Sequence, residues 1–282
     1  MELLSKAVPI AMLSFVVSSM LAVGLSLTIR EIAASLRNGR LVFLALLANF
    51  VLMPLGAFAI ARILKLDQPL GIALLLLGAA AGAPFLPKLA GIAKGNLAFA
   101  VGLMVLLMVL TVAYMPLVLP LLLEGVSVDP MKIARSLVLL MLLPLGIGLA
   151  VNAWFGSIAG KMRGPLNKIS TLSLVLLIVL LLVTNIQNVI SLFGTRGILA
   201  SILFLFVGAG MGWLLGGPGF GTKGVLSLAT AQRNIAAALV VAGKEFDDPK
   251  VLVMIVVVAV VGLLILMPLA RFFGTRSAGA TA

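Results

Sequence analysis

Most of the chain is divided among nine apolar stretches, each close to the roughly 20 residues that a helix needs to cross a bilayer. Short linkers with proline, glycine or aspartate separate them. Hydrophobic residues make up 63% of the chain and charged residues only 10%, well outside the range of soluble domains. We therefore predict an all-α polytopic membrane protein, a single transmembrane domain over residues 1–282. The predicted spans are about 7–28, 41–64, 70–93, 97–123, 133–154, 171–190, 197–216, 222–243 and 250–273, with linkers such as 164–165 and 248–249.

The distribution of lysine and arginine predicts the orientation of these spans. If the N-terminus lies outside and the spans alternate, the inner loops and C-terminus hold 10 basic residues and the outer side holds 8. Basic residues favour the cytoplasmic side, and they are dense next to the first two spans and around 161–168. We expect a cell inner-membrane protein with an external N-terminus and a cytoplasmic C-terminus.

Several classes of function are disfavoured by what the composition lacks. The chain has no cysteine and no histidine, which excludes thiol chemistry and removes the commonest proton shuttle and metal ligand. No paired aspartates or serine–base pair suggests an enzyme, and a thiol-dependent metalloid exporter is disfavoured. The net charge of +12 reflects the basic residues at span ends, so we expect a lipid bilayer and not nucleic acid as the partner.

Two cations remain inside the predicted spans once all loops are assigned. They are Lys88 and Arg233, whereas all eight acidic residues lie outside the predicted spans. A charged side chain at membrane depth is costly, so it must face protein or a water-filled cavity, and a functional role is the default hypothesis. The open alternatives are that Arg233 only pins backbone carbonyls and that Lys88 extends to the inner surface.

Each of these cations lies in a small-residue segment that is predicted to break. Pro84 and Pro87 precede Lys88, and each removes a backbone donor and disfavours a continuous helix. Gln232, Arg233 and Asn234 point to different sides of any regular helix, so an interruption would shelter them together. The third and eighth spans then correspond, which indicates an inverted repeat of about 7–123 and 133–273 and a transporter built on two broken, crossing helices.

Three motifs resemble the bile acid:sodium symporter family across nearly the whole chain. They are ANFVLMPL at 48–55, AKGN at 93–96 and ATAQRNIA at 229–236. The resemblance implies a panel made of the first, fifth and sixth spans and a core made of spans two to four and seven to nine. It also implies that the first helix of the ten-helix bacterial form is missing here.

The same resemblance shows where this chain departs from the family. The family's sodium-site positions fall at Leu86, Pro87, Ala100, Met104, Ala229 and Arg233, which have almost no side-chain oxygen. Polar character remains at Asn49 and Asn234. We therefore expect Lys88 and Arg233 to replace the bound cations by donating hydrogen bonds to the carbonyls at the crossing.

The predicted function is secondary active transport of a small organic anion by alternating access, with sodium possible but disfavoured and proton coupling, exchange or facilitation open. The alternatives are a sodium-coupled organic anion or bile acid symporter with backbone-built sites, and a non-transporting membrane scaffold or sensor. The protein would be a monomer or homodimer without a bound cofactor. Thr111 and Tyr114 are further candidates for lining the cavity. The candidate site residues are Arg233, Gln232, Asn234, Lys88, Thr230, Asn49, Pro84 and Pro87.

Overall fold

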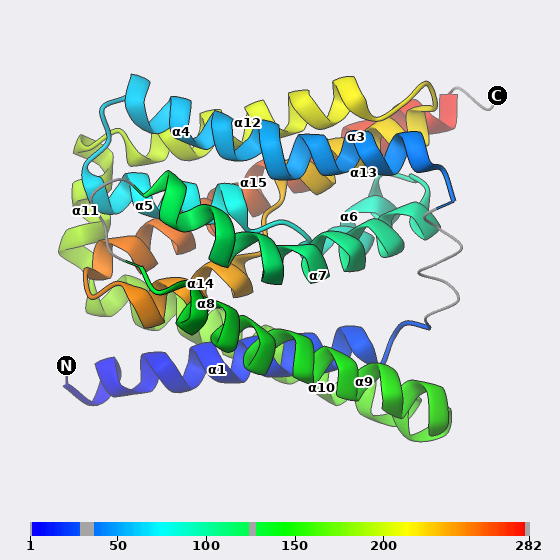
Figure 1. Ribbon diagram of the computed structural model, residues 1–282, viewed down its shortest axis with the longest axis horizontal. Helices are drawn as coiled ribbons and strands as arrows, with labels where there is room; N and C mark the ends of the chain where they lie inside the picture. Colours follow the sequence, from blue (N-terminus) through cyan, green and yellow to red (C-terminus); the bar gives the residue numbers. More distant parts are fainter. Residues whose placement is uncertain (1, 29–36, 124–127, 280–282) are drawn as a thin grey trace.

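The computed structural model describes residues 2–28, 37–123 and 128–279, and these residues form helices and no strands (Figure 1). Arg30, Glu31 and Glu124, which the topology assigns to loops, lie outside the described residues. The helices are α1 (Glu2–Gly24), α3 (Gly39–Leu47), η1 (Ala48–Leu52), α4 (Met53–Ile63), α5 (Gln68–Ala79), α6 (Leu86–Ile92), α7 (Leu97–Leu122), α8 (Pro130–Leu137), η2 (Val138–Leu142), α9 (Leu143–Trp154), α10 (Gly156–Thr184), α11 (Ile186–Gly194), α12 (Gly197–Leu215), α13 (Phe220–Ala231), α14 (Ile235–Glu245) and α15 (Pro249–Gly279).

Within the described residues, eight helical units are long and apolar enough to cross a membrane. They include α3–η1–α4, α8–η2–α9 and α13–α14, each counted as one unit. The predicted third span is instead the short apolar helix α5, followed by the separate helix α6. The polytopic, all-helical class is therefore confirmed, whereas a count of nine spanning helices stays a prediction.

The predicted boundaries of the sixth span are wrong. Helix α10 begins at Gly156 and not near residue 171, so the expected linker at Gly164 and Pro165 lies inside a helix. Its other end is Thr184, and the separate helix α11 follows. The reason is that hydropathy locates the part of a helix that lies in hydrocarbon, and α10 continues past it with exposed basic residues.

Helices α1, α9 and α10 pack against one another and form a distinct group along one side of the molecule (Figure 1). Glycine permits the closest approach in this group. A Cβ atom on Gly24 of α1 would lie 2.3 Å from the carbonyl oxygen of Leu145, and one on Gly148 of α9 would lie 2.6 Å from that of Leu21. We call α1, α9 and α10 the three-helix group.

The remaining long helices form a larger group that contains both interrupted helices. Within it α12 lies along α13, and small residues at four-residue spacing make their contact close. A Cβ atom on Gly208, Gly212 or Gly216 would meet the α13 backbone at 2.9, 2.3 or 2.4 Å. Such a stripe lets backbones approach without a hydrophobic driving force, as membrane helices require.

Candidate functional site

The two interrupted helices cross at their breaks and hydrogen-bond to each other there. The first break separates α5 from α6 at residues 80–85, and the second separates α13 from α14 at residues 232–234. The backbone N–H of Asn234 donates to the carbonyl of Ala80 at 2.9 Å, and its Nδ2 donates to that of Gly82 at 3.0 Å. Its Oδ1 accepts the N–H of Ala237 and caps α14. Asn234 therefore caps α14 and also hydrogen-bonds to the unwound backbone after α5.

The first break depends on a glycine and a threonine. Gly82 has φ +80°, and a Cβ atom there would lie 2.3 Å from the Met108 nitrogen of α7. The Thr111 hydroxyl, also on α7, accepts from the Ala81 N–H at 3.0 Å and donates to the Ala81 carbonyl at 3.1 Å. The unwound backbone thus has partners although it lies deep in the protein, as non-helical backbone at membrane depth requires.

Arg233 lies next to the crossing, 3% exposed, and its guanidinium makes five hydrogen bonds. Nε donates to the carbonyl of Leu77 at 2.8 Å, and Nη2 to that of Gly78 at 2.6 Å. These carbonyls belong to the last turn of α5, where helix ends leave acceptors free and carry partial negative charge. Nη1 donates to Asn49 Oδ1 at 2.7 Å and to the Thr230 carbonyl at 3.2 Å, and Nη2 also donates to the Asn49 carbonyl at 3.3 Å.

The carbonyl of Asn49 is free because of the local sequence around Pro54. In the π-helical turn η1 the N–H of Met53 donates to Ala48, five residues back, which skips Asn49. Pro54 has no N–H, so it cannot donate to Asn49 or to Phe50. Arg233 Nη2 donates to the carbonyl of Asn49, and the Tyr114 hydroxyl donates to the carbonyl of Phe50 at 2.5 Å.

All the hydrogen-bond partners of Arg233 are neutral. Its positive charge therefore faces carbonyl and amide dipoles and not a carboxylate, and the fork of five N–H groups is fully used. A bound metal cation could use the same oxygen atoms as ligands, because backbone carbonyls at a helix C-terminus are typical cation ligands in membrane transporters.

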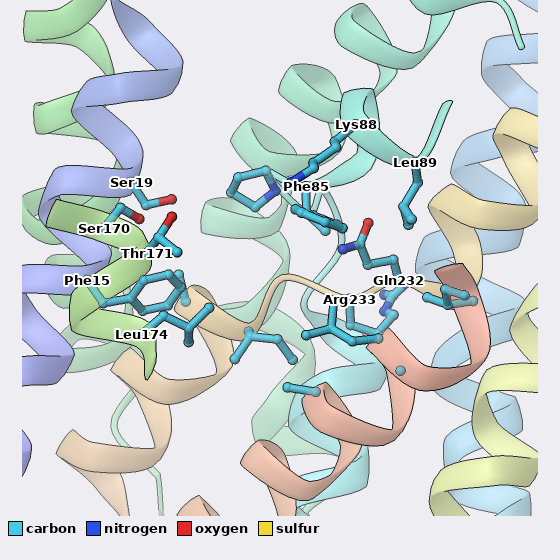
Figure 2. Close-up of a pocket in the computed structure, with 18 of the residues that line it drawn as sticks. Phe15, Ser19, Phe85, Lys88, Leu89, Ser170, Thr171, Leu174, Gln232 and Arg233 are labelled. Atoms are coloured by element: carbon cyan, nitrogen blue, oxygen red, sulfur yellow. The ribbon is translucent and has the colours of Figure 1, made fainter. Parts of the chain in front are cut away.

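A cavity of about 420 Å³ lies between the three-helix group and the larger group (Figure 2). One wall comes from α1 and α10, and the opposite wall from the two breaks, α6, α12 and α15. Most of its lining is apolar, as in small-molecule sites generally. Figure 2 shows Ser19, Ser170 and Thr171 on the first wall, facing Phe85, Lys88 and Gln232 across the space.

Lys88 extends from α6 into this cavity and is exposed to it. Its ammonium lies 5.1 Å from the centre of the Phe85 ring and makes no hydrogen bond or ion pair with any described residue. The expectation that Lys88 holds crossing carbonyls is therefore wrong. Helix α6 begins only at Leu86, so Lys88 lies in its first turn, and its ammonium lies in the cavity beside Phe85. A cation without a counter-charge in a cavity is suited to receive an anion.

The structure divides the other predicted site residues into two sets. Gln232, Arg233 and Pro84 line the cavity together with Lys88, and the Oε1 atom of Gln232 is buried without a hydrogen-bond partner. Asn49, Thr230 and Asn234 are fully buried behind the crossing, and Pro87 is partly buried; these four do not line the cavity. Of the six family sodium-site positions, Leu86, Ala100, Met104 and Ala229 are buried apolar residues.

Sequence reasoning also misplaced or missed several residues. Thr111 and Tyr114 do not line the cavity, because their hydroxyls bond the backbones of Ala81 and Phe50. The polar lining residues Asn167, Ser170 and Thr171 on α10 were missed. Their i, i+3, i+4 spacing is a usable signal for one helix face, but the predicted sixth span begins only at Thr171, so Asn167 and Ser170 fall in the predicted loop.

Comparison with known proteins places the chain among transporters. Residues 12–192 match the profile of the Sodium Bile acid symporter family. The probable sodium/metabolite cotransporter BASS2, chloroplastic, of rice (Oryza sativa subsp. japonica) is 30% identical over 241 residues, covering 83% of this chain and 57% of that protein. The corresponding BASS1 of Arabidopsis thaliana is 25% identical over 235 residues, covering 82% and 58%.

A bacterial relative gives the same result. The uncharacterized sodium-dependent transporter YocS of Bacillus subtilis (strain 168) is 27% identical over 199 residues, covering 70% of this chain and 60% of YocS. The matched regions thus span less than two thirds of each of these relatives. The resemblance inferred from the three short motifs is confirmed, and the chain belongs to the sodium bile acid symporter family, a family of membrane transporters and not of enzymes.

Proposed function

We propose that this chain carries a small organic anion across the cell inner membrane by alternating access, without sodium at the family's usual sites. The observation that carries the proposal is the ammonium of Lys88, exposed in an apolar cavity and free of any counter-charge among the described residues. An anion that enters the cavity gains this attraction in an environment of low dielectric constant. The three-helix group would act as the fixed panel, and the larger group as the moving core.

The replacement of sodium is supported by the partners of Arg233. Its five hydrogen bonds use carbonyl oxygens around the crossing that would otherwise be available to a bound cation. The buried apolar side chains at Leu86, Ala100, Met104 and Ala229 have no oxygen to complete a sodium shell. A fixed guanidinium cannot dissociate, so it supplies the positive charge in every state of the transport cycle.

The basic residues and the position of the cavity support an orientation in the membrane. The lining uses the C-terminal half of α1, the middle of α10 from Asn167 to Ile178, and α6, whose end adjoins the basic linker predicted to be cytoplasmic. We infer an external N-terminus, a cytoplasmic C-terminus and a cavity that opens inward.

Sodium coupling is the second candidate, because the relatives are named sodium/metabolite cotransporters and a sodium-dependent transporter. Free backbone carbonyls would then supply the sodium shell. A non-transporting scaffold or sensor is disfavoured, because the cavity reaches Gln232 and Arg233 at the crossing.

Thermal stability of the purified protein separates the first two candidates. Sodium chloride is compared with choline chloride at equal ionic strength, and acetate, benzoate, phenylacetate and 2-naphthoate are then added as probe anions. A ligand that binds only the folded state raises its stability by about RT ln(1 + [L]/Kd). We expect a saturable shift with at least one carboxylate and none with sodium. A saturable sodium shift would refute the sodium replacement, and the absence of any carboxylate shift would refute the anion site.

A further inference from the structure

We propose that this protein is an obligatory anion exchanger, because the unpaired ammonium of Lys88 prevents the empty carrier from changing sides. The inference rests on the proposed function and extends it to the mode of transport. Each turnover would carry one anion in one direction and return with another, so that neither direction proceeds without an anion.

The described lining of the cavity carries positive charge and no negative charge. Its titratable lining residues are Lys88 and Arg233, both cationic, and the lining contains no carboxylate. Arg233 is compensated by five neutral acceptors in the structure and needs no further partner. Among the described residues, the Lys88 ammonium has only the Phe85 ring as a partner, so water must solvate its charge when the cavity is empty.

The opposite end of the molecule is closed by contacts between helices. There α14 contacts both α1 and α8, and a Cβ atom on Gly243 would lie 3.0 Å from the end of the Met12 side chain. Lys132 of α8 pairs with Glu245 of α14 at 3.1 Å and also donates to the Lys244 carbonyl at 2.6 Å. To open this end, the two helix groups must separate here and come together over the present cavity.

Closure of the cavity removes the Lys88 ammonium from water. Closing it empty removes water from an ammonium that has no hydrogen-bond or ion-pair partner in the described part of the chain, and an uncompensated buried charge is strongly unfavourable. Closing it around a carboxylate buries a neutral pair, which costs far less. The loaded carrier can therefore cross and the empty carrier cannot.

Loss of the lysine proton is the other way to remove this charge, and it would couple transport to protons. The lining contains no carboxylate or imidazole that could relay that proton through the protein, and the chain contains no histidine, so the proton would have to leave to cavity water before the cavity closes. Arg233, the second cation of the lining, is a donor with no acceptor function. Exchange is thus the mode that the described residues support.

The first test measures the movement of the empty carrier, and the absence of native cysteine makes it direct. Met12, which is 6% exposed at the closed end, is replaced by cysteine as a reporter in proteoliposomes with the external end facing out. Reaction with a membrane-impermeant maleimide requires that end to open. In anion-free buffer we expect the Met12→Cys, Lys88→Met protein to react at least 100-fold faster than Met12→Cys alone, a barrier difference of about 2.7 kcal/mol.

Two further variants control this test. Lys88→Arg keeps the cation and should keep the slow reaction, whereas Lys161→Met removes an exposed lysine of α10 outside the cavity and should change nothing. Equal reaction rates with and without the Lys88 ammonium would overturn the proposal, whatever the protein transports.

The second test measures transport itself. Proteoliposomes are loaded with whichever of the four carboxylates gives the largest thermal shift, in radiolabelled form, and efflux is followed with and without the same anion outside. We expect efflux to need the external anion, with at least a tenfold difference that Lys88→Met reduces. Efflux that is equally fast into anion-free buffer would refute exchange but leave anion transport intact.

Two other results have distinct meanings. Empty-carrier return that accelerates with rising pH, and does so only with Lys88 present, would replace exchange by proton coupling. Failure of every carboxylate to bind or move would refute the proposed function and exchange together.

Discussion

Replacement of Arg233 by methionine should strongly destabilise the folded protein. The substitution keeps an unbranched side chain but removes the donors to five acceptors, which are the carbonyls of Asn49, Leu77, Gly78 and Thr230 and the Oδ1 of Asn49. The Leu77 carbonyl keeps the Ala80 N–H at 3.2 Å, so four of these acceptors lose their partner. A buried acceptor without a partner costs about 1 kcal/mol at the low end, so the four together cost about 4 kcal/mol. Removing a buried charge offsets part of this, and we expect a net loss of about 3 kcal/mol.

The matched variant Arg233→Lys tests whether hydrogen bonds cause the effect. An ammonium has three donors, so at least one of the four dependent acceptors loses its partner, and we expect a loss of about 1 kcal/mol. Charge alone would predict no loss for lysine.

The assay is unfolding in mixed micelles with increasing sodium dodecyl sulfate, followed by tryptophan fluorescence. Arg271→Met, at an exposed position of α15, is the control and should unfold as the wild type does. The reasoning fails if Arg233→Met unfolds together with this control, or if lysine proves as damaging as methionine.

Three other variants probe the supports of the site. Gly82→Ala should prevent stable folding, because its Cβ would lie 2.3 Å from Met108 nitrogen at φ +80°, whereas Gly71→Ala in α5 should be tolerated; detergent-solubilised yield measures both. Thr111→Val should lower unfolding stability by about 2 kcal/mol by leaving both backbone groups of Ala81 without a partner, and Thr111→Ser should restore most of it. Glu245→Gln should weaken closure at the external end by about 1 kcal/mol and speed labelling of Met12→Cys about fivefold; an unchanged rate would show that the Lys132 pair does not hold that end closed.

The sequence predicted those parts of the fold that depend on the apolar length of a single segment. Apolar length located the membrane-crossing parts because that property is local to each segment. It failed at the start of α10, where Lys161 and Arg163 continue a helix beyond the hydrocarbon and Pro165 is accommodated at an exposed position. The prolines at 84 and 87 correctly indicated an interruption, although α5 already ends at Ala79.

For the site, the sequence could identify the cations but not their partners. Arg233 was conspicuous because it lies in a small-residue segment. Its bonds to Leu77 and Gly78 could not be predicted, because those residues offer only carbonyls and the choice of carbonyl is made by tertiary packing. Lys88 shows the same limit, since its role depends on where α6 begins. The proline five residues after Asn49 was a readable sign of free carbonyls there.

The contacts of Arg233 also impose an order on the folding of the protein during its synthesis. The carbonyl acceptors of Leu77 and Gly78 precede their donor by 156 and 155 residues, and Asn49 precedes it by 184. During translation these groups therefore enter the bilayer long before the guanidinium is synthesised, and water or transient neighbours must satisfy them until then. The first half of the chain cannot satisfy these acceptors by itself. Its folding is therefore completed only when the segment around Arg233 has been inserted.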